Sequence, residues 1–543
     1  MKWLRRFCLV AGLTTALFAA PLFAQVPSPL QIAITNGNAM LSWPNSNSIC
    51  SLQTTTSLSP PVQWGSKAVT YGGGIVNFPV NNPQQFFRLA NAVPVFQFEI
   101  FYNLDLDIAP GQTMVMNGPV FANGNIWMWP YATINFSNFV AAAGTVNAQE
   151  DPNNQESSDG YVAPTYIPGQ PVSHMRPLVL LVAATNAALT NLSRTILNLP
   201  PPNVGAPNPA AYSPTGQVYL YNAVDLIISN SASGLPGTHG TNITIWYQDT
   251  NNVTALTQLL PNTTNGFGTG VTNRFFSFVT NVQFFDFRES DTVQAVQIDV
   301  AKLNVWLTNT TGTGGNQYNQ QSFANKSHGI DSIFIYNNVP QTASQLPAVR
   351  LINGQQLPYT VDPGGSGLAT GGLTVATPMP LYVKGNYNVQ TATSSAGASA
   401  GTTNMAYTYP AALMGDAITI LSGNWLDSYF VGTSLSSRSP VSTTINAACL
   451  AGIVQSTNSG GNNYYSGGLE NFLRLEENWA ASYTLTYNGS IVVMFPSIYA
   501  TNFWQVPGNY YNPPMRQWNF DLNFTVPSKL PPLTPTVANF ISP

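Results

Sequence analysis

The chain has 543 residues, which is enough for several domains. Only 7 % of them are charged, well below the usual quarter of a globular protein, and the net charge is −4. So few Lys and Arg residues argue against a protein that binds nucleic acid or an anionic membrane surface, since both need clustered cations. Polar positions are filled instead by Gly, Pro, Asn, Ser and Thr.

Residues 1–24 have the three parts of a secretory signal peptide. Cations stand at the start (Lys2, Arg5 and Arg6), residues 7–18 are apolar, and small residues precede the expected cleavage after Ala24. The apolar run is too short to span a bilayer as a retained anchor. We predict an exported protein, extracellular, on the cell surface or in the periplasm, with no transmembrane segment after cleavage. The mature chain would carry 14 basic and 21 acidic residues, a net charge near −7.

Residues 25–92 read as a small antiparallel β-sandwich. Short runs that alternate apolar and polar residues recur along this segment, and turn pairs such as Asn36-Gly37 separate them. The runs are Leu30–Ile34, Ala39–Trp43, Ser51–Thr55, Gly74–Phe78 and Gln85–Leu89. Trp43 and Trp64 are expected to pack in its core, with sugar stacking as the alternative role.

The same segment resembles a fibronectin-type-III-like module of large secreted proteins from environmental Gram-negative bacteria. The resemblance is carried by Leu41-Ser42-Trp43-Pro44, by Leu52–Leu58, by Trp64 and by Phe86-Phe87-Arg88-Leu89. It implies that residues 25–92 serve as a spacer or an adhesive unit.

A second region, residues 96–535, reads as a large β-solenoid-like domain, or parallel β-helix. Short apolar strands alternate with Asn-Gly and Gly-Pro turns, and each such unit can form one coil that turns at Gly or Asn. Early units include Phe98–Tyr102, Leu104–Ile108, Met114–Val120, Asn123–Trp127 and Thr133–Phe136, and late ones include Leu373–Val375, Leu381–Val383, Ala417–Leu421, Thr444–Ala448 and Tyr487–Val493. No fixed period emerges, and a second sandwich is the competing interpretation. The fold class is therefore mostly β.

An α/β segment is expected to be inserted around residues 150–310. Helix-like patterns cover Leu178–Leu192 and Asp299–Leu307, while Tyr221–Ile228 and Ile243–Tyr247 read as strands. Residues 536–543 are left as a C-terminal tail.

Residues 96–535 also resemble an uncharacterised family of secreted envelope proteins, distantly like pilus-assembly accessory proteins. The motifs that carry this resemblance are Asn117–Val120, Asn123–Ile126, Gly372–Val375, Leu381–Val383, Ala411–Ser422 with Trp425, Gly467–Asn471 through Glu477 and Trp479, Leu485–Ile491 and Tyr511–Asp521. The resemblance implies an envelope protein without established catalytic residues. The sequence lacks the prepilin leader of a pilus subunit, so incorporation into a pilus is not expected.

The candidate catalytic residues are the carboxylates Asp286, Glu289 and Asp291. Enzymes that cleave polysaccharides on a β-helix use paired carboxylates as acid and base. These three belong to the densest charge cluster of the chain, with Arg288, Asp299 and Lys302. The favoured interpretation is a surface ion-pair cluster at the start of a helix, because Asp299 and Lys302 are three residues apart. The Gly/His turn Gly237–Gly240 is like a turn of pectin-cleaving β-helices, but it is weak evidence for catalysis because the paired aspartates that accompany that turn are missing.

A second charge cluster and several aromatic residues suggest carbohydrate binding. Glu470, Arg474, Glu476 and Glu477 read first as a helical cap over one face of the solenoid. The candidate sugar-stacking residues are Tyr464, Tyr465, Trp479, Tyr510 and Tyr511, because aromatic rings stack on the apolar faces of sugars.

No cofactor and no metal site is expected. His174, His239 and His328 are isolated, and Asp105 with Asp107 provides too few oxygen ligands for calcium. The mature chain keeps Cys50 and Cys449, for which two separate thiols are favoured over a disulfide.

Three functions remain open at this point. A structural or adhesive surface protein without catalytic activity is favoured, with a link to pilus or surface assembly from the resemblance. Carbohydrate binding comes second, and a polysaccharide hydrolase or lyase third. The expected partners are cell-surface polysaccharide or other envelope proteins.

Overall fold

The structure is a computed structural model that describes most of the chain after residue 92 and parts of the chain before it. The described residues are 30–35, 38–43, 49–55, 65–71, 74–79, 86–90, 92–154, 160–167, 169–180, 193–200, 216–231, 243–248, 256–259, 263–264, 274–308, 329–361, 369–480, 482–504 and 509–539. The predicted signal peptide lies outside them. The described chain is mostly β, as predicted, and it divides into two compact units.

The first unit comprises Met1–Val93 and Thr525–Pro527. Six strands form two antiparallel sheets in it, with the orders β1-β2-β5 and β4-β3-β6. They are β1 (Gln31–Thr35), β2 (Asn38–Trp43), β3 (Ile49–Thr55), β4 (Gly65–Tyr71), β5 (Gly74–Pro79) and β6 (Phe86–Ala90). The sequence pattern missed β4, and the side chains of Trp43 and Trp64 lie outside the described residues.

The second unit, Pro94–Phe524 and Ser528–Pro543, begins with three-residue strands that stack in parallel. Ile100 pairs with Val120 and Val120 with Val140, so each coil takes 20 residues. The strands of the three sides are β8 (Ile100–Tyr102), β11 (Val120–Ala122) and β14 (Val140–Ala142); β9 (Leu106–Ile108), β12 (Ile126–Met128) and β15 (Val146–Asn147); and β10 (Met114–Met116), β13 (Ile134–Phe136) and β16 (Thr165–Tyr166).

The sequence of these coils explains their geometry. In β10 the side chains of Met114 and Met116 are buried and Val115 points outward, which is the two-residue period of a strand. Gly124 stands where coils touch, because a Cβ there would lie 2.6 Å from the backbone nitrogen of Asp105 in the coil before it. Only glycine allows that approach.

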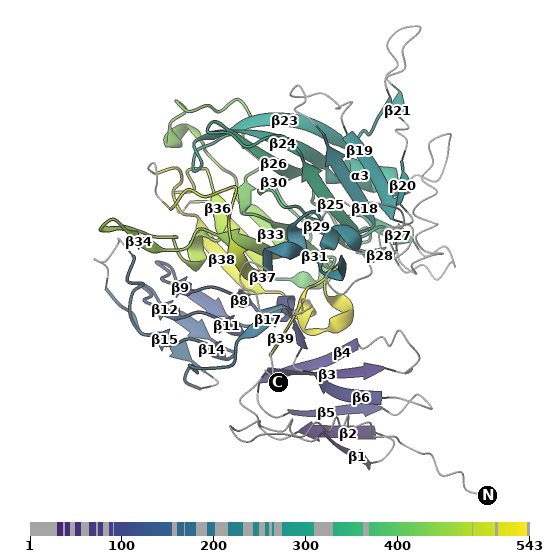
Figure 1. Ribbon diagram of the computed structural model, residues 1–543, viewed down its shortest axis with the longest axis vertical. Helices are drawn as coiled ribbons and strands as arrows, with labels where there is room; N and C mark the ends of the chain where they lie inside the picture. The colour runs from purple at the N-terminus through teal and green to yellow at the C-terminus, as the bar shows by residue number, and fades with distance from the viewer. Residues whose placement is uncertain are drawn as a thin grey trace, which may run out of the picture. The chain divides into compact units, whose positions relative to one another are not determined.

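These coils continue into a 12-stranded sheet that runs through the whole second unit (Figure 1). Beyond β8 its order is β37 (Thr484–Pro496), β33 (Thr443–Ile453), β31 (Ala411–Gly415), β29 (Leu373–Ala376), β25 (Ser332–Asn337), β18 (Leu226–Asn230), β19 (Ile243–Gln248) and β20 (Leu256–Gln258), and β38 (Met515–Phe520) also pairs with β37. All pairs from β14 to β18 are parallel, while β19 and β20 are antiparallel. The predicted strand Ile243–Tyr247 is therefore an outer strand of this sheet.

A six-stranded sheet is the second large sheet of this unit. Its order is β23 (Val279–Asp286), β24 (Asp291–Asp299), β26 (Gln345–Ile352), β30 (Leu381–Lys384), β32 (Ile418–Leu421) and β36 (Leu473–Leu475), and only the β23–β24 pair is antiparallel. Strands β18, β23 and β24 of the predicted α/β insertion thus contribute to the two large sheets.

The two predicted helices have different outcomes. The helix α3 (Val300–Thr308) matches the expectation for Asp299–Leu307, and the Asp299 side chain caps it by accepting the Lys302 N–H at 3.0 Å. The prediction for Leu178–Leu192 was wrong at its start, because Leu178–Leu180 is strand β17 and pairs with β39 (Thr536–Asn539). Residues 181–192 lie outside the described chain. The expected C-terminal tail thus contributes a strand.

The remaining elements are short. They are the strands β7 (Ala92–Pro94), β21 (Thr263–Thr264), β22 (Arg274–Phe275), β27 (Tyr359–Val361), β28 (Ala369–Gly371), β34 (Thr457–Ser459) and β35 (Asn462–Tyr464), and the 3-10 helices η1 (Val95–Gln97), η2 (Arg194–Leu197), η3 (Gly216–Val218), η4 (Leu220–Asn222), η6 (Met405–Tyr407), η7 (Leu435–Ser437), η8 (Leu469–Asn471), η9 (Leu522–Thr525) and η10 (Pro527–Lys529).

One hydrophobic core runs inside the second unit. It extends without a break from residues of the first coils, such as Ile126, through Ile491 to Leu226 at the other end. A smaller cluster around Trp425 covers the six-stranded sheet. Among the described residues, none of the helices has the length and apolar character needed to cross a membrane.

Candidate functional site

The predicted catalytic carboxylates are part of a buried structural network. Asp286 and Glu289 are 3 % and 8 % exposed, so the expectation of a surface cluster was wrong for them. Asp286 accepts the Tyr382 hydroxyl at 2.5 Å, and Glu289 forms an ion pair with Arg474 at 2.5 Å. Asp291 is half-buried and pairs with Asp286 across β23 and β24.

Glu289 has further structural partners in the backbone. The second oxygen of Glu289 accepts the backbone N–H groups of Thr501 and Asn502 at 2.9 and 3.0 Å. Burial raises the pKa of Glu289 against the opposing effect of Arg474. None of Asp286, Glu289 and Asp291 lines the pocket that holds Tyr511 or the pocket that holds Asp105.

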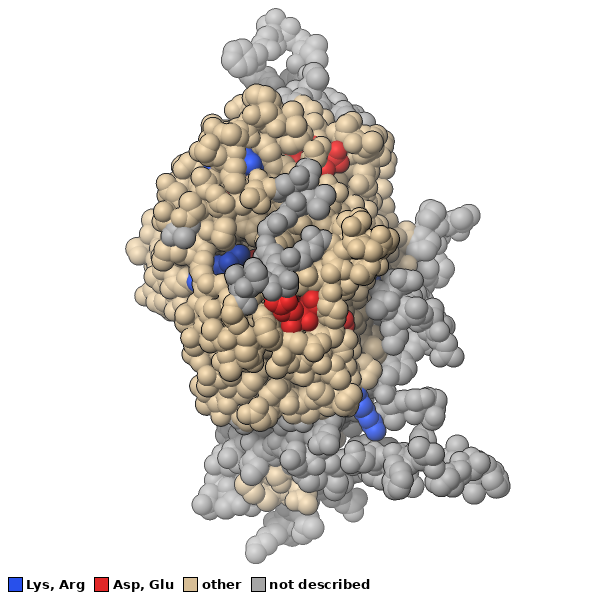
Figure 2. All heavy atoms as spheres, turned by 90° about the vertical axis from the view of Figure 1, so that its left-hand side faces the viewer, with Lys and Arg blue, Asp and Glu red and all other residues tan. Residues whose placement is uncertain are grey.

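The second charge cluster is buried too, so the prediction of an exposed helical cap was wrong. Glu476 and Glu477 are each 1 % exposed and follow strand β36. Glu476 accepts the Phe287 N–H at 2.8 Å, and Glu477 accepts the N–H and hydroxyl of Ser422 at 2.6 and 2.7 Å. Many charged side chains of the described residues are buried. Figure 2 shows one face of the molecule, on which Lys, Arg, Asp and Glu are few among the described residues.

The predicted aromatic residues separate into three groups. Tyr465, Tyr510 and Tyr511 line one common pocket. Tyr464 is half-buried outside it and stacks on Phe503 with ring centroids 4.8 Å apart. Trp479 is 0 % exposed inside the core, so its ring has no face for a ligand.

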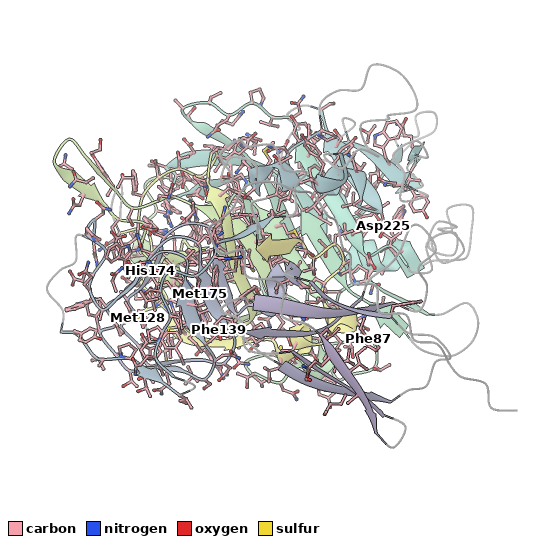
Figure 3. The ribbon with its side chains drawn as sticks, turned by 60° about the horizontal axis from the view of Figure 1, so that its bottom comes forward. Phe87, Met128, Phe139, His174, Met175 and Asp225 are labelled. Carbon is pink, nitrogen blue, oxygen red and sulfur yellow. The ribbon has the colours of Figure 1, made fainter. Side chains whose placement is uncertain are left out.

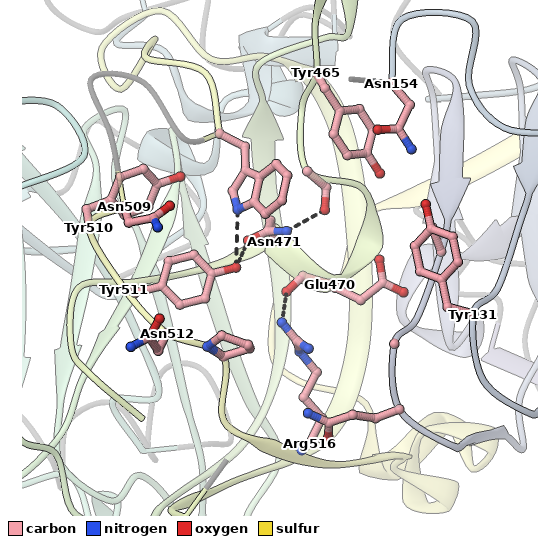
Figure 4. Close-up of a pocket in the computed structure, with 16 residues that line it drawn as sticks. Tyr131, Asn154, Tyr465, Glu470, Asn471, Asn509, Tyr510, Tyr511, Asn512 and Arg516 are labelled. Carbon is pink, nitrogen blue, oxygen red and sulfur yellow. Dashed lines mark hydrogen bonds between the residues drawn. The ribbon is translucent and has the colours of Figure 1, made fainter. Parts of the chain in front are cut away.

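We call the common pocket the aromatic pocket (Figure 4). Its volume is about 420 Å³, within the range of small-molecule sites. Its wall consists of Ala109, Gly111, Gln112, Tyr131, Asn154, Tyr465, Gly467, Glu470, Asn471, Trp504, Asn509, Tyr510, Tyr511, Asn512, Pro513 and Arg516. The loops after β9 and β12 provide one side, and the segments around η8 and β38 provide the other. The pocket therefore forms where N-terminal and C-terminal segments of the second unit meet.

Hydrogen bonds hold the aromatic wall in place. The Tyr511 hydroxyl donates to Asn471, which itself donates to the Gly467 carbonyl at 2.5 Å. The indole N–H of Trp504 donates to the Tyr511 hydroxyl at 3.3 Å. The Trp504 ring meets Tyr465 edge to face, with centroids 5.8 Å apart. These contacts preorganise the rings before any ligand binds.

Two charged residues, Glu470 and Arg516, face the pocket (Figure 4). Glu470 is 6 % exposed, and burial raises its pKa to about 7 against the opposing effects of Arg516 and backbone hydrogen bonds. Arg516 donates from Nη2 to the Glu470 carbonyl at 3.2 Å. The carboxyl therefore titrates near neutral pH.

Sequence reasoning missed much of this pocket. Trp504 and Asn509 stand close to Tyr510 and Tyr511 in a stretch rich in aromatic and amide residues, and that density was an available signal. Tyr131 and Gln112 had no such signal, since they come from coils almost 400 residues earlier than Tyr511 and Arg516.

The second unit also holds a smaller, acidic pocket. It has a volume of about 120 Å³ and is lined by Asp105, Asp107 and Asp151 among others. Asp105 is exposed and accepts the Asn125 N–H at 2.7 Å, while Asp107 is 5 % exposed. Within the described chain, no three His, Cys, Asp or Glu side chains gather in a way that could hold a metal ion.

The isolated histidines and cysteines add no site in the described chain. His174 is exposed beside the buried Met175 (Figure 3), and His239, His328 and Gly237–Gly240 lie outside the described residues. Cys449 is a buried free thiol, and the side chain of Cys50 is not among those described.

Comparisons of the chain with known protein families, with curated proteins and with solved structures find no match.

Proposed function

We propose that this protein is an exported surface protein that binds carbohydrate through the aromatic pocket. The observation that carries the proposal is the gathering of Tyr465, Trp504, Tyr510 and Tyr511 with several amide side chains in one cavity. Sugars present apolar C–H faces, which stack on aromatic rings, and hydroxyl groups, which exchange hydrogen bonds with amides. The low charge of the chain suits a neutral or weakly charged ligand.

Amide groups in the wall support this ligand class. Asn509 is exposed and has no hydrogen-bond partner among the described residues. Asn512 uses its Nδ2 to donate to Asn478 at 2.6 Å, which leaves its carbonyl oxygen as an acceptor. The Asn512 amide, held by Asn478, and the Asn509 amide can both exchange hydrogen bonds with sugar hydroxyls.

The architecture supports a display role. We interpret the second unit as a β-solenoid, because its coils stack in parallel along the large sheet. We interpret the first unit as a fibronectin-III-like β-sandwich, on its two three-stranded antiparallel sheets. A small module followed by a rigid stack suits an adhesive protein that presents a binding site away from its attachment point. The link to pilus assembly stays a prediction from the sequence resemblance.

A glycan array with the mature protein tests the proposal. We expect binding to a subset of oligosaccharides, reduced at least about 5-fold by Trp504→Ala, since stacking of a ring on an aromatic side chain is worth roughly 1–3 kcal/mol. Tyr407→Ala is the matched control, because Tyr407 is 42 % exposed and lies outside the pocket. If no glycan binds, or if both variants bind like the original protein, the proposal is wrong.

A further inference from the structure

We propose that the aromatic pocket selects acidic sugars, with the Arg516 guanidinium binding the carboxylate of a uronic acid residue. This inference rests on the proposed function, carbohydrate binding in the same pocket, and names the class of sugar. It starts from an arginine that faces a cavity and forms no ion pair among the described residues.

Arg516 is fixed in its position at the start of β38. Its backbone N–H donates to the Gln112 side chain at 3.0 Å, and its Nη2 donates to the Glu470 carbonyl at 3.2 Å. The guanidinium carbon lies 5.8 Å from the centre of the Trp518 ring. A guanidinium held in this way has little further freedom to lose when a ligand binds.

Arg516 also has unused donor capacity. Its Nε is buried without a hydrogen-bond partner in the described part of the chain, and its one side-chain hydrogen bond there leaves from Nη2 rather than Nη1. Two other arginines of the second unit differ in this respect: Arg350 is bidentate to Asp427 at 2.6 and 2.7 Å, and Arg474 pairs with Glu289. A carboxylate is the anion that matches the planar donor fork of a guanidinium. Among the described residues no carboxylate forms an ion pair with Arg516, so its guanidinium can pair with a carboxylate of a ligand.

Glu470 determines when that site is positive. Below pH 7 its carboxyl is mostly protonated, and Arg516 gives the pocket a net positive charge. Above pH 7 the ionised carboxylate neutralises Arg516 and repels an anionic ligand. The other titratable groups around Glu470 are Tyr102, Tyr465, Tyr511 and Asp107, and burial raises the pKa of each of them. The three tyrosines therefore stay uncharged over this range, and burial disfavours the charged form of Asp107.

The experiment compares acidic oligosaccharides with their carboxyl-reduced forms by isothermal titration calorimetry at pH 5.5 and pH 8.5. The acidic form should bind at least about 10-fold more tightly at pH 5.5, since hydrogen bonds to a charged group are the stronger kind. The preference should shrink at pH 8.5. A sulfated oligosaccharide without carboxylates forms a third arm, and tighter binding of that probe would overturn the assignment to uronic acids.

Two variants sharpen the result. Arg516→Gln should remove the preference for the acidic form, and Glu470→Gln should retain it at pH 8.5. Arg176→Gln is the control, because Arg176 is exposed and outside the pocket. Should Arg516→Gln fail to fold, the pH profiles of the unmodified protein and of Glu470→Gln still decide the question. Equal binding of both sugar forms would overturn this inference and leave the proposed function standing, whereas absence of all binding would overturn both.

Discussion

The Arg474 guanidinium and the Glu289 carboxylate, 185 residues apart in the sequence, form an ion pair of 2.5 Å inside the second unit. Both side chains are about 5 % exposed or less, and Arg474 also donates to the Ala500 carbonyl at 2.7 Å. Arg474→Met would leave Glu289 buried without its partner. We expect it to lower the free energy of unfolding by roughly 3–5 kcal/mol, measured by urea unfolding with Trp fluorescence.

The control for this prediction is Lys302→Met. Lys302 is 57 % exposed and lies 3.7 Å from Asp299, so its loss should change the free energy of unfolding by less than about 1 kcal/mol. Equal effects of the two variants would contradict a structural role for the buried network.

A second prediction concerns Gly489 in β37. A Cβ at this position would lie 2.0 Å from the Ala447 carbonyl oxygen in the neighbouring strand, far inside van der Waals contact. Gly489→Ala should therefore force the strands apart and cost on the order of 2 kcal/mol or more. Gly111→Ala is the comparison, because a methyl group at that position would have no neighbour within 4 Å, and this variant should fold normally. Matching thermal unfolding temperatures for both would disprove the argument.

A third prediction concerns Glu99, which accepts the Gly118 N–H at 2.6 Å. Burial raises its pKa from 4.5 to about 8, against the lowering effect of backbone hydrogen bonds from Gly118 and Asn117. The folded state thus holds this proton more tightly than the unfolded state. Its contribution to stability is fully present below about pH 4.5 and is lost as the pH rises through 8.

Glu99→Gln tests this dependence, because the amide keeps an acceptor oxygen and cannot ionise. As the pH rises from 5 to 8.5, the original protein should lose stability and the variant should not. The free energy of unfolding of the variant relative to the original protein should therefore increase over this range, by an amount on the order of a few kcal/mol. Urea unfolding midpoints at the two pH values provide the measurement. A constant difference between the two proteins would show that Glu99 does not titrate in this window.

A fourth prediction concerns the Cys449 thiol in the core. The side chain is 0 % exposed, and burial raises its pKa to about 12. Thiolates react with disulfide reagents and thiols do not, so Cys449 should be inert in the native protein. Ellman's reagent should detect this thiol only after denaturation in guanidinium chloride. A Cys50→Ser variant isolates the signal of Cys449, and rapid reaction of that folded variant would rule out the buried position.

The mostly-β character and many strands were predictable from the sequence. The alternation of buried and half-buried residues in Ile126–Met128 and the turn at Gly124 are local features, so a short stretch of sequence is enough to predict them. The 20-residue period was not found, because only three coils share it and equivalent apolar positions can hold different residues, such as Leu106, Ile126 and Val146.

The positions of the charges were harder to predict. Spacing correctly indicated the exposed Asp299–Lys302 pair, which depends on one helix alone. It misplaced Glu289 and Arg474, because only the pairing of distant strands brings them together. The aromatic pocket was predictable to the same extent. Tyr510 and Tyr511 were identified because they are adjacent in the sequence, whereas Tyr131 reaches the pocket only through the tertiary fold.

The pairing of β8 with β37 joins Ile100 to Ile491 and has a consequence for biogenesis. The N-terminal coils are synthesised first, yet one edge of their sheet stays without its neighbour until almost the entire polypeptide has left the ribosome. An unpaired apolar edge invites aggregation, and contacts between such distant segments form slowly. The nascent chain therefore needs protection by chaperones until β37 emerges, and a fragment that stops before residue 484 should be insoluble.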